Sequence, residues 1–94
     1  MKAHTDLEVV ELDDIPNVGP AIISALASVG VTRPEQLVQK DPYKLYTKLC
    51  QVTGKRHDPC VLDTFMAAVD FMNGAPARQW WYYTKERKSK YPKV

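Results

Sequence analysis

The sequence is poor in cysteine, glycine and long apolar runs. It has two cysteines and four glycines among 94 residues. Because disulfide-stabilised small folds are dense in cysteine, we expect reduced thiols and a cytoplasmic protein. No apolar run approaches the roughly 20 residues that cross a membrane, and the acidic first 14 residues are unlike a signal peptide. The sequence therefore predicts a single small globular domain without a membrane span.

The net charge is only +2, but it is unevenly distributed. Residues 1–14 hold five acidic residues and one lysine, whereas residues 78–94 hold six basic residues and one glutamate. A basic end is typical of nucleic-acid binding, and it is equally typical of an ordinary solvated tail. Charge alone therefore admits a nucleic-acid partner without requiring one.

Helix start signals predict an all-α domain without strands. Asp41 and Asp58 each precede a proline, and an aspartate cap followed by proline at the first helical position is a strong start signal. The expected helices lie at about residues 6–12, 20–29, 33–38, 42–53, 59–73 and 77–88, with 59–73 as the central one. The prediction is a compact domain of five to six helices over residues 1–88, followed by a frayed basic tail at 89–94.

Three finer expectations accompany these helices. Leu7 and Val10 are expected to face the core from the first helix. Thr32 is expected to cap the third helix in a capping box with Glu35. Gly30 is expected to end the second helix, because glycine readily adopts the left-handed conformation found after a helix.

The turn that runs from Ile15 to Pro20 opens directly into the second helix. Gly19 is expected to take backbone angles that a side chain would forbid, and Pro20 fits the first helical turn. Such a turn leaves backbone N–H groups free at a helix N-terminus, which is a ready site for an anion such as phosphate. The alternative is that the turn serves only as a packing corner.

Several motifs together resemble one small bacterial family. They are Ile15-Pro16-Asn17-Val18-Gly19-Pro20, Gly30-Val31, Asp41-Pro42, Lys48-Leu49-Cys50, Thr53-Gly54, Cys60-Val61-Leu62 and Trp80-Trp81. This pattern, over about residues 12–85, resembles the "pathogenicity locus" proteins, also labelled mitomycin-resistance-like. The resemblance implies a helix-hairpin-helix (SAM-like) fold, in which the hairpin holds a DNA phosphate through its amides.

The resemblance assigns candidate contacts and reveals two departures. Asn17, Val18, Gly19 and Ala21 are the candidate contacts of the hairpin to nucleic acid, and the amides of the last three would hold the phosphate. Asn17 replaces the usual first glycine of the hairpin, and asparagine tolerates the left-handed conformation that this position needs. Ala21 stands where many DNA-binding members carry lysine or arginine, so a counter-charge is missing there.

Lys55 and Arg56 are the candidates to supply the missing charge. They lie in the loop before the central helix, and in related two-part hairpin domains a second loop also contacts the DNA backbone. Asp13 and Asp14 adjoin the hairpin and would repel a phosphate. The leading expectation is a non-enzymatic, sequence-independent module that binds DNA, or alternatively RNA, through its phosphates.

The aromatic run Trp80, Trp81, Tyr82 and Tyr83 supports an alternative function. Aromatics beside cations can stack on the bases of a single strand, but docking on the core or on a partner is the more common role. One tryptophan is expected to cover the core and the tyrosines to lie at the surface. The alternative function is therefore a protein-interaction adaptor, with this run as the contact surface for a partner or a second copy.

Cys60 is the one candidate for a reactive thiol. It follows Asp58 in the first turn of a helix, where the helix dipole and nearby cations favour a thiolate. The alternative is a packed, unreactive thiol. Cys50, His57 and Cys60 lack the spacing of a zinc site, and no catalytic motif is present, so no enzyme activity, metal or cofactor is expected.

Overall fold

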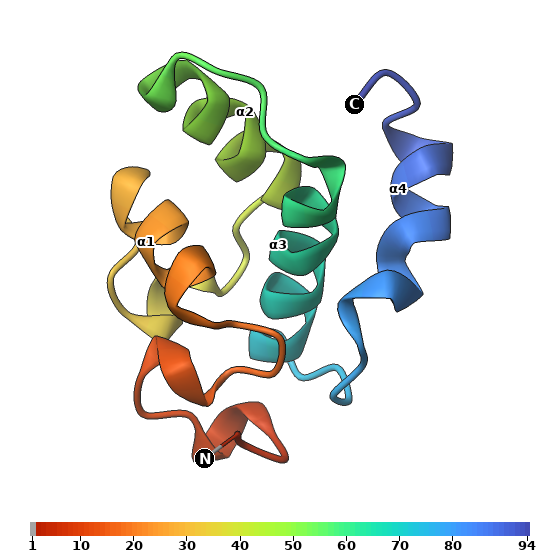
Figure 1. Ribbon diagram of the computed structural model, residues 1–94. Coiled ribbons are helices and arrows are strands. Elements are labelled where there is room, and N and C mark those ends of the chain that lie inside the picture. The colour runs from red at the N-terminus through yellow and green to blue at the C-terminus, as the bar shows by residue number, and fades with distance from the viewer. Residues whose placement is uncertain (1) are drawn as a thin grey trace.

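The chain folds into α-helices and short 3-10 turns. The computed structural model describes residues 2–94, and within them no strand is present (Figure 1). The α-helices are α1 (Pro20–Ser28), α2 (Pro42–Thr53), α3 (Pro59–Met72) and α4 (Thr84–Lys90). The 3-10 turns are η1 (Asp6–Glu8), η2 (Leu12–Asp14), η3 (Pro34–Leu37) and η4 (Trp80–Tyr83). The all-α prediction is confirmed, but several expected helices are single 3-10 turns.

The first three α-helices begin and end at the signals that predicted them. Each begins with proline at its first position, and Asp41 and Asp58 accept amide hydrogen bonds at the starts of α2 and α3. Gly30 and Gly54 follow α1 and α2 with φ angles of +87° and +70°. This is the left-handed conformation that closes a helix and that glycine adopts without strain.

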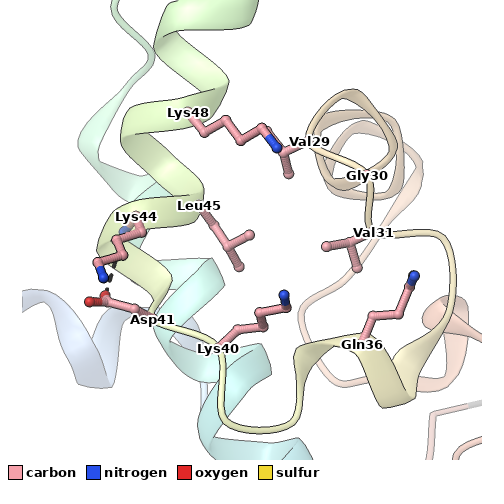
Figure 2. Close-up of a pocket in the computed structure, with 9 residues that line it drawn as sticks. All are labelled: Val29, Gly30, Val31, Gln36, Lys40, Asp41, Lys44, Leu45 and Lys48. Carbon is pink, nitrogen blue, oxygen red and sulfur yellow. Dashed lines mark hydrogen bonds between the residues drawn. The ribbon is translucent and has the colours of Figure 1, made fainter.

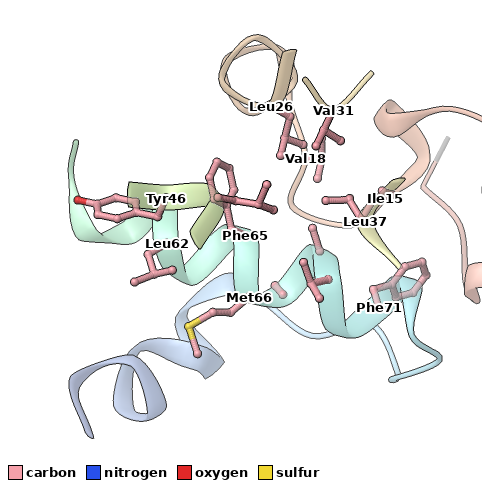
Figure 3. Close-up of a cluster of buried hydrophobic side chains, with 14 of the residues drawn as sticks. Ile15, Val18, Leu26, Val31, Leu37, Tyr46, Leu62, Phe65, Met66 and Phe71 are labelled. Carbon is pink, nitrogen blue, oxygen red and sulfur yellow. The ribbon is translucent and has the colours of Figure 1, made fainter. Parts of the chain in front are cut away.

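The core is built around α3, as its apolar sequence predicts. In Figure 1, α3 lies between α1 and α2 on one side and α4 on the other. Its Phe65 is fully buried, and Figure 3 shows Leu26 from α1 and Ile15 and Val18 from the turn before α1 on the same side of α3. The radius of gyration is 12.2 Å, close to the ~12 Å expected for a compact chain of this length.

A buried ion pair attaches α4 to α3. Asp63 is completely buried and accepts a hydrogen bond from Arg87 Nε at 2.8 Å and another from Thr84 Oγ1 at 2.7 Å. The Asp63 carboxylate raises the pKa of the Arg87 guanidinium. The partners are 24 residues apart in sequence, so no local pattern predicted this pair.

The predicted first helix at residues 6–12 is wrong. Residues 6–8 form one 3-10 turn, after which Val9 has the extended angles φ −76° and ψ 125°. Leu7 and Val10 are 91% and 80% exposed. An extended chain alternates its side chains, so Val9 packs against the core while Val10, the next residue, points away from it.

The predicted capping box is formed by a different residue. Gln36 Oε1 accepts the amides of Thr32 and Arg33 at 2.7 and 2.9 Å. Glu35 instead pairs with Arg33 at 3.2 Å on the surface. The turn begins one residue later than expected, which moves the reaching side chain from position 35 to position 36.

The C-terminal residues pack against the rest of the fold. The ring of Tyr91 stacks on that of Tyr43 in α2, with 4.4 Å between centroids and 5° between planes. Val94 also packs against the core.

Within residues 2–94, no helix is both long and apolar enough to cross a bilayer.

Candidate nucleic-acid interface

Residues 15–20, here called the hairpin, hold the left-handed residue at Asn17. Its φ angle is +72°, as expected for the asparagine that replaces a glycine. Gly19 has the extended angles φ −114° and ψ −173°, so the special backbone conformation expected there is wrong. Ile15 and Val18 are fully buried and anchor the hairpin to the core. The turn therefore obtains its shape from Asn17.

The hairpin and the first turn of α1 leave a set of amides open. Val18 was expected to hold a phosphate as well, but it donates its N–H to Ile15 O at 3.2 Å, inside the hairpin. Within residues 2–94, no acceptor takes the amides of Gly19, Ala21 and Ile22. A Cβ atom built on Gly19 meets nothing within 4 Å. These three donors therefore form an open N-terminus of the kind that binds anions.

The side chain of Asn17 holds the C-terminal segment against the hairpin. Its Nδ2 donates to Arg78 O at 2.7 Å, and its Oδ1 accepts the amide of Trp80 at 3.2 Å. Asn17 was predicted as a contact to nucleic acid, but both polar atoms of its amide group have partners inside the protein. The result is that η4, with its aromatic residues, lies next to the hairpin.

Two cations that the sequence did not assign to this site lie beside the hairpin. Lys2 Nζ donates to the carbonyl oxygens of Asp13 at 2.6 Å and Ile15 at 3.0 Å, and also to that of Val18. Lys2 and Arg78 both line a hollow of about 300 Å³ that adjoins Asn17. Both residues are distant from the hairpin in sequence, so no local sequence pattern predicted that they would lie beside it.

Lys55 and Arg56 are not brought to the hairpin. Both are exposed in the loop before α3, whereas the hairpin lies near the C-terminal end of α3 (Figure 1). A 14-residue helix such as α3 is roughly 20 Å long. Lys55 and Arg56 therefore lie too far from Ala21 to contact the same phosphate.

The acidic residues before the hairpin are partly engaged within the chain. Asp14 Oδ2 accepts the amides of Val10 and Glu11 at 3.0 and 2.9 Å. These backbone hydrogen bonds lower the pKa of Asp14. Asp13 is exposed. Their negative charge remains close to the hairpin and weakens its attraction for an anion.

The aromatic run divides into a buried and an exposed part. Tyr83 is buried, which contradicts its predicted place on a partner surface, and burial raises the pKa of its hydroxyl. Trp80 is half-buried, whereas Trp81 and Tyr82 are each 59% exposed. The guanidinium of Arg78 lies 4.6 Å from the centre of the Tyr82 ring. A tyrosine, not a tryptophan, fills the core, and the exposed rings extend the hairpin surface.

Cys60 does not have the environment of a reactive thiol. Burial raises the pKa of Cys60, and the neighbouring Asp58 carboxylate raises it further. Asp58 accepts the amide of Cys60 at 2.9 Å, which places a negative charge where the helix dipole was expected to favour a thiolate. Among residues 2–94, histidine, cysteine, aspartate and glutamate side chains form no group of three that could hold a metal ion.

The fold and this surface define a small all-helical protein with an open helix N-terminus beside basic and aromatic side chains. The chain belongs to the family described as "Pathogenicity locus", which matches residues 5–89. It is also 45% identical over 78 residues to "Mitomycin resistance protein McrB" of Streptomyces lavendulae, covering 83% of this chain and 74% of that protein. No solved structure matches the chain.

Proposed function

We propose that this protein binds the phosphate backbone of nucleic acid, without sequence specificity and without catalysis. The observation that carries the proposal is the open set of amides at Gly19, Ala21 and Ile22, which have no acceptor within residues 2–94. We also infer that η2, the hairpin and α1 form a motif of the helix-hairpin-helix type. A phosphate at these amides would interact favourably with the dipole of α1.

Charge beside the hairpin supports the same function. Lys2 and Arg78 line the adjoining hollow and can attract the strand beside the held phosphate. Ala21 is exposed and contributes no charge. The affinity is therefore expected to be modest and to fall steeply with salt, because released counterions dominate backbone binding.

The exposed rings of Trp81 and Tyr82 favour a single strand over a duplex. They project next to the hairpin because Asn17 holds the chain on either side of position 79. Bases of a single strand can stack on such rings, whereas those of a duplex are already stacked. DNA and RNA both offer this chemistry.

Binding of labelled single-stranded and duplex oligonucleotides tests the proposal. We expect the single strand to bind more tightly, and the affinity to fall at least tenfold between about 50 and 200 mM salt. Ala21→Lys should tighten binding and Ala21→Glu should weaken it, while both variants remain folded because the residue is exposed. Salt-independent binding, or equal affinities of the two variants, would contradict the proposal.

A second candidate function is a protein-interaction adaptor, and the same two exposed rings favour it. Trp81 and Tyr82 are each 59% exposed, and exposed aromatic residues are enriched in protein interfaces. A homodimer is the simplest form of this alternative. Sedimentation of the wild type against a Trp81→Ala variant distinguishes the two, because only the adaptor predicts a concentration-dependent dimer that the substitution weakens.

A further inference from the structure

A pocket at the opposite end of α1 from the hairpin has the composition of a ligand site. It lies between the end of α1, η3 and the first turns of α2 (Figure 2), and its volume is about 350 Å³. This volume falls within the range of small-molecule sites. The hairpin and the aromatic run contribute no residue to it.

Two lysines direct positive charge into this pocket. In Figure 2, the ammonium groups of Lys40 and Lys48 reach toward the cavity, whereas that of Lys44 points away. Neither Lys40 nor Lys48 forms an ion pair within residues 2–94. Asp41 also lines the pocket, but its Oδ1 accepts the amides of Tyr43 and Lys44. The two ammonium groups are therefore available to a ligand with negative charge.

The floor of the pocket is apolar, and one polar group is fixed at its edge. Val29, Val31 and Leu45 line the cavity and are each less than 10% exposed. Gln36 lines it as well, and its Oε1 already accepts the amides of Thr32 and Arg33. This leaves Nε2 of Gln36 as the donor that a ligand can use. The combination fits a ligand with an anionic end and a ring that carries an acceptor.

We propose that this pocket binds an organic phosphate monoester that carries a flat ring, the chemistry of a nucleoside 5′-monophosphate. The phosphate, which is close to doubly charged at neutral pH, lies between Lys40 and Lys48. The ring covers the apolar floor, and Gln36 donates to an acceptor on its edge. The same chemistry is offered by a free nucleotide and by the phosphorylated end of a strand.

Calorimetric titration of the whole protein with inorganic phosphate, ribose 5-phosphate and uridine 5′-monophosphate tests the proposal. We expect the affinity to rise in that order, because only the last compound covers the floor. Lys40→Gln and Lys48→Gln should each lower the affinity for uridine 5′-monophosphate about tenfold, as expected for a lost charged hydrogen bond. Equal affinities for the three compounds would overturn the proposal.

Lys44→Gln is the matched control, because Lys44 lies on the same helix with its ammonium group turned away. It should leave the affinity unchanged, and a loss equal to that of Lys48→Gln would show nonspecific charge attraction and overturn the proposal. A Gly19→Asp variant separates this site from the hairpin. It should retain nucleotide binding, and its failure to bind would assign the nucleotide to the hairpin instead.

Oligonucleotides with a 5′-phosphate or a 5′-hydroxyl distinguish the two sources of the ligand. If strand ends occupy the pocket, the phosphorylated oligonucleotide binds more tightly, and Lys48→Gln abolishes the difference. If free nucleotides occupy it, the two oligonucleotides bind equally while uridine 5′-monophosphate still depends on Lys48.

Discussion

Three helices of this protein begin with proline, but their N-terminal amides have different partners. At α2 and α3, the residue before the proline is an aspartate, and Asp41 and Asp58 accept the first amides of their helices. At α1 the same position is Gly19, which has no side chain to accept them. The helix starts are otherwise alike, so the residue before the proline makes the difference.

This difference separates a structural helix start from a candidate binding site. The hydrogen bond from the Cys60 amide lowers the pKa of Asp58, so this carboxylate stays charged and occupies the N-terminus of α3. An external anion would be repelled there. The N-terminus of α1 has no capping side chain at its positive dipole end, and the hollow lined by Lys2 and Arg78 adjoins Asn17 of the hairpin. The aspartate-capped starts of α2 and α3 thus serve stability, whereas the uncapped start of α1 leaves its amides available to an anion.

The largest effect is expected when α3 loses the ion pair with α4. Asp63→Ala leaves Arg87 with no carboxylate in a site where its side chain is only 11% exposed. We expect a loss of about 3–5 kcal/mol in the free energy of unfolding, measured by urea denaturation. Glu86→Gln is the control, because the exposed pair Lys90–Glu86 should contribute less than about 1 kcal/mol. Equal effects of the two substitutions would contradict this account.

A smaller effect is expected when the hairpin is released from the C-terminal segment. Asn17→Gly keeps the left-handed backbone but loses both hydrogen bonds of the side chain, which should cost about 1–2 kcal/mol. Asn17→Ala should cost about 1 kcal/mol more, because alanine is strained at a φ angle of +72°. Denaturation curves of both variants measure the two contributions separately, and equal stabilities would show that the left-handed angle is not retained.

Removal of the two aspartate caps makes the starts of α2 and α3 resemble that of α1. Asp41→Ala and Asp58→Ala each remove a side-chain cap and should destabilise the protein by about 1 kcal/mol. Asp58→Asn should have a smaller effect, because asparagine also caps helices well. Thermal unfolding followed by circular dichroism measures the three changes. Alanine variants as stable as the wild type would mean that the caps contribute nothing.

The smallest effect concerns the thiol behind the Asp58 cap. Because burial and the Asp58 carboxylate raise the pKa of Cys60, its alkylation at pH 7 should be slower than that of a free cysteine. Asp58→Asn removes the contribution of the Asp58 carboxylate and should accelerate alkylation of Cys60. Alkylation faster than that of free cysteine in the wild type would contradict this reading and restore Cys60 as a reactive thiol.

Local signals in the sequence predicted the helix starts well. Each of Pro20, Pro42 and Pro59 is the first residue of an α-helix, because proline at this position costs no hydrogen bond. The left-handed angle at Asn17 was also predicted from the residue type. These features depend on a few neighbouring residues, which the sequence displays directly.

Contacts between distant residues were not predictable in the same way. The pair Asp63–Arg87 joins residues 24 positions apart, and Asn17 contacts a segment more than 60 residues away. Lys2 reaches the hairpin through the same kind of long-range packing. Charge at positions 55 and 56 is visible in the sequence, but its distance from the hairpin depends on the direction of α3. Consequently the elements were predicted better than the composition of the candidate site.

The claim that the uncapped amides of α1 hold a phosphate can be tested by substitution of Gly19. Aspartate at this position can accept the amides of Ala21 and Ile22, as Asp41 does at α2, whereas alanine cannot; the space and the extended angles at Gly19 accommodate either side chain. Binding of a labelled single strand at low salt should be lost in Gly19→Asp, with the helical fold intact, and largely kept in Gly19→Ala. Unchanged binding by a folded Gly19→Asp protein would contradict the claim.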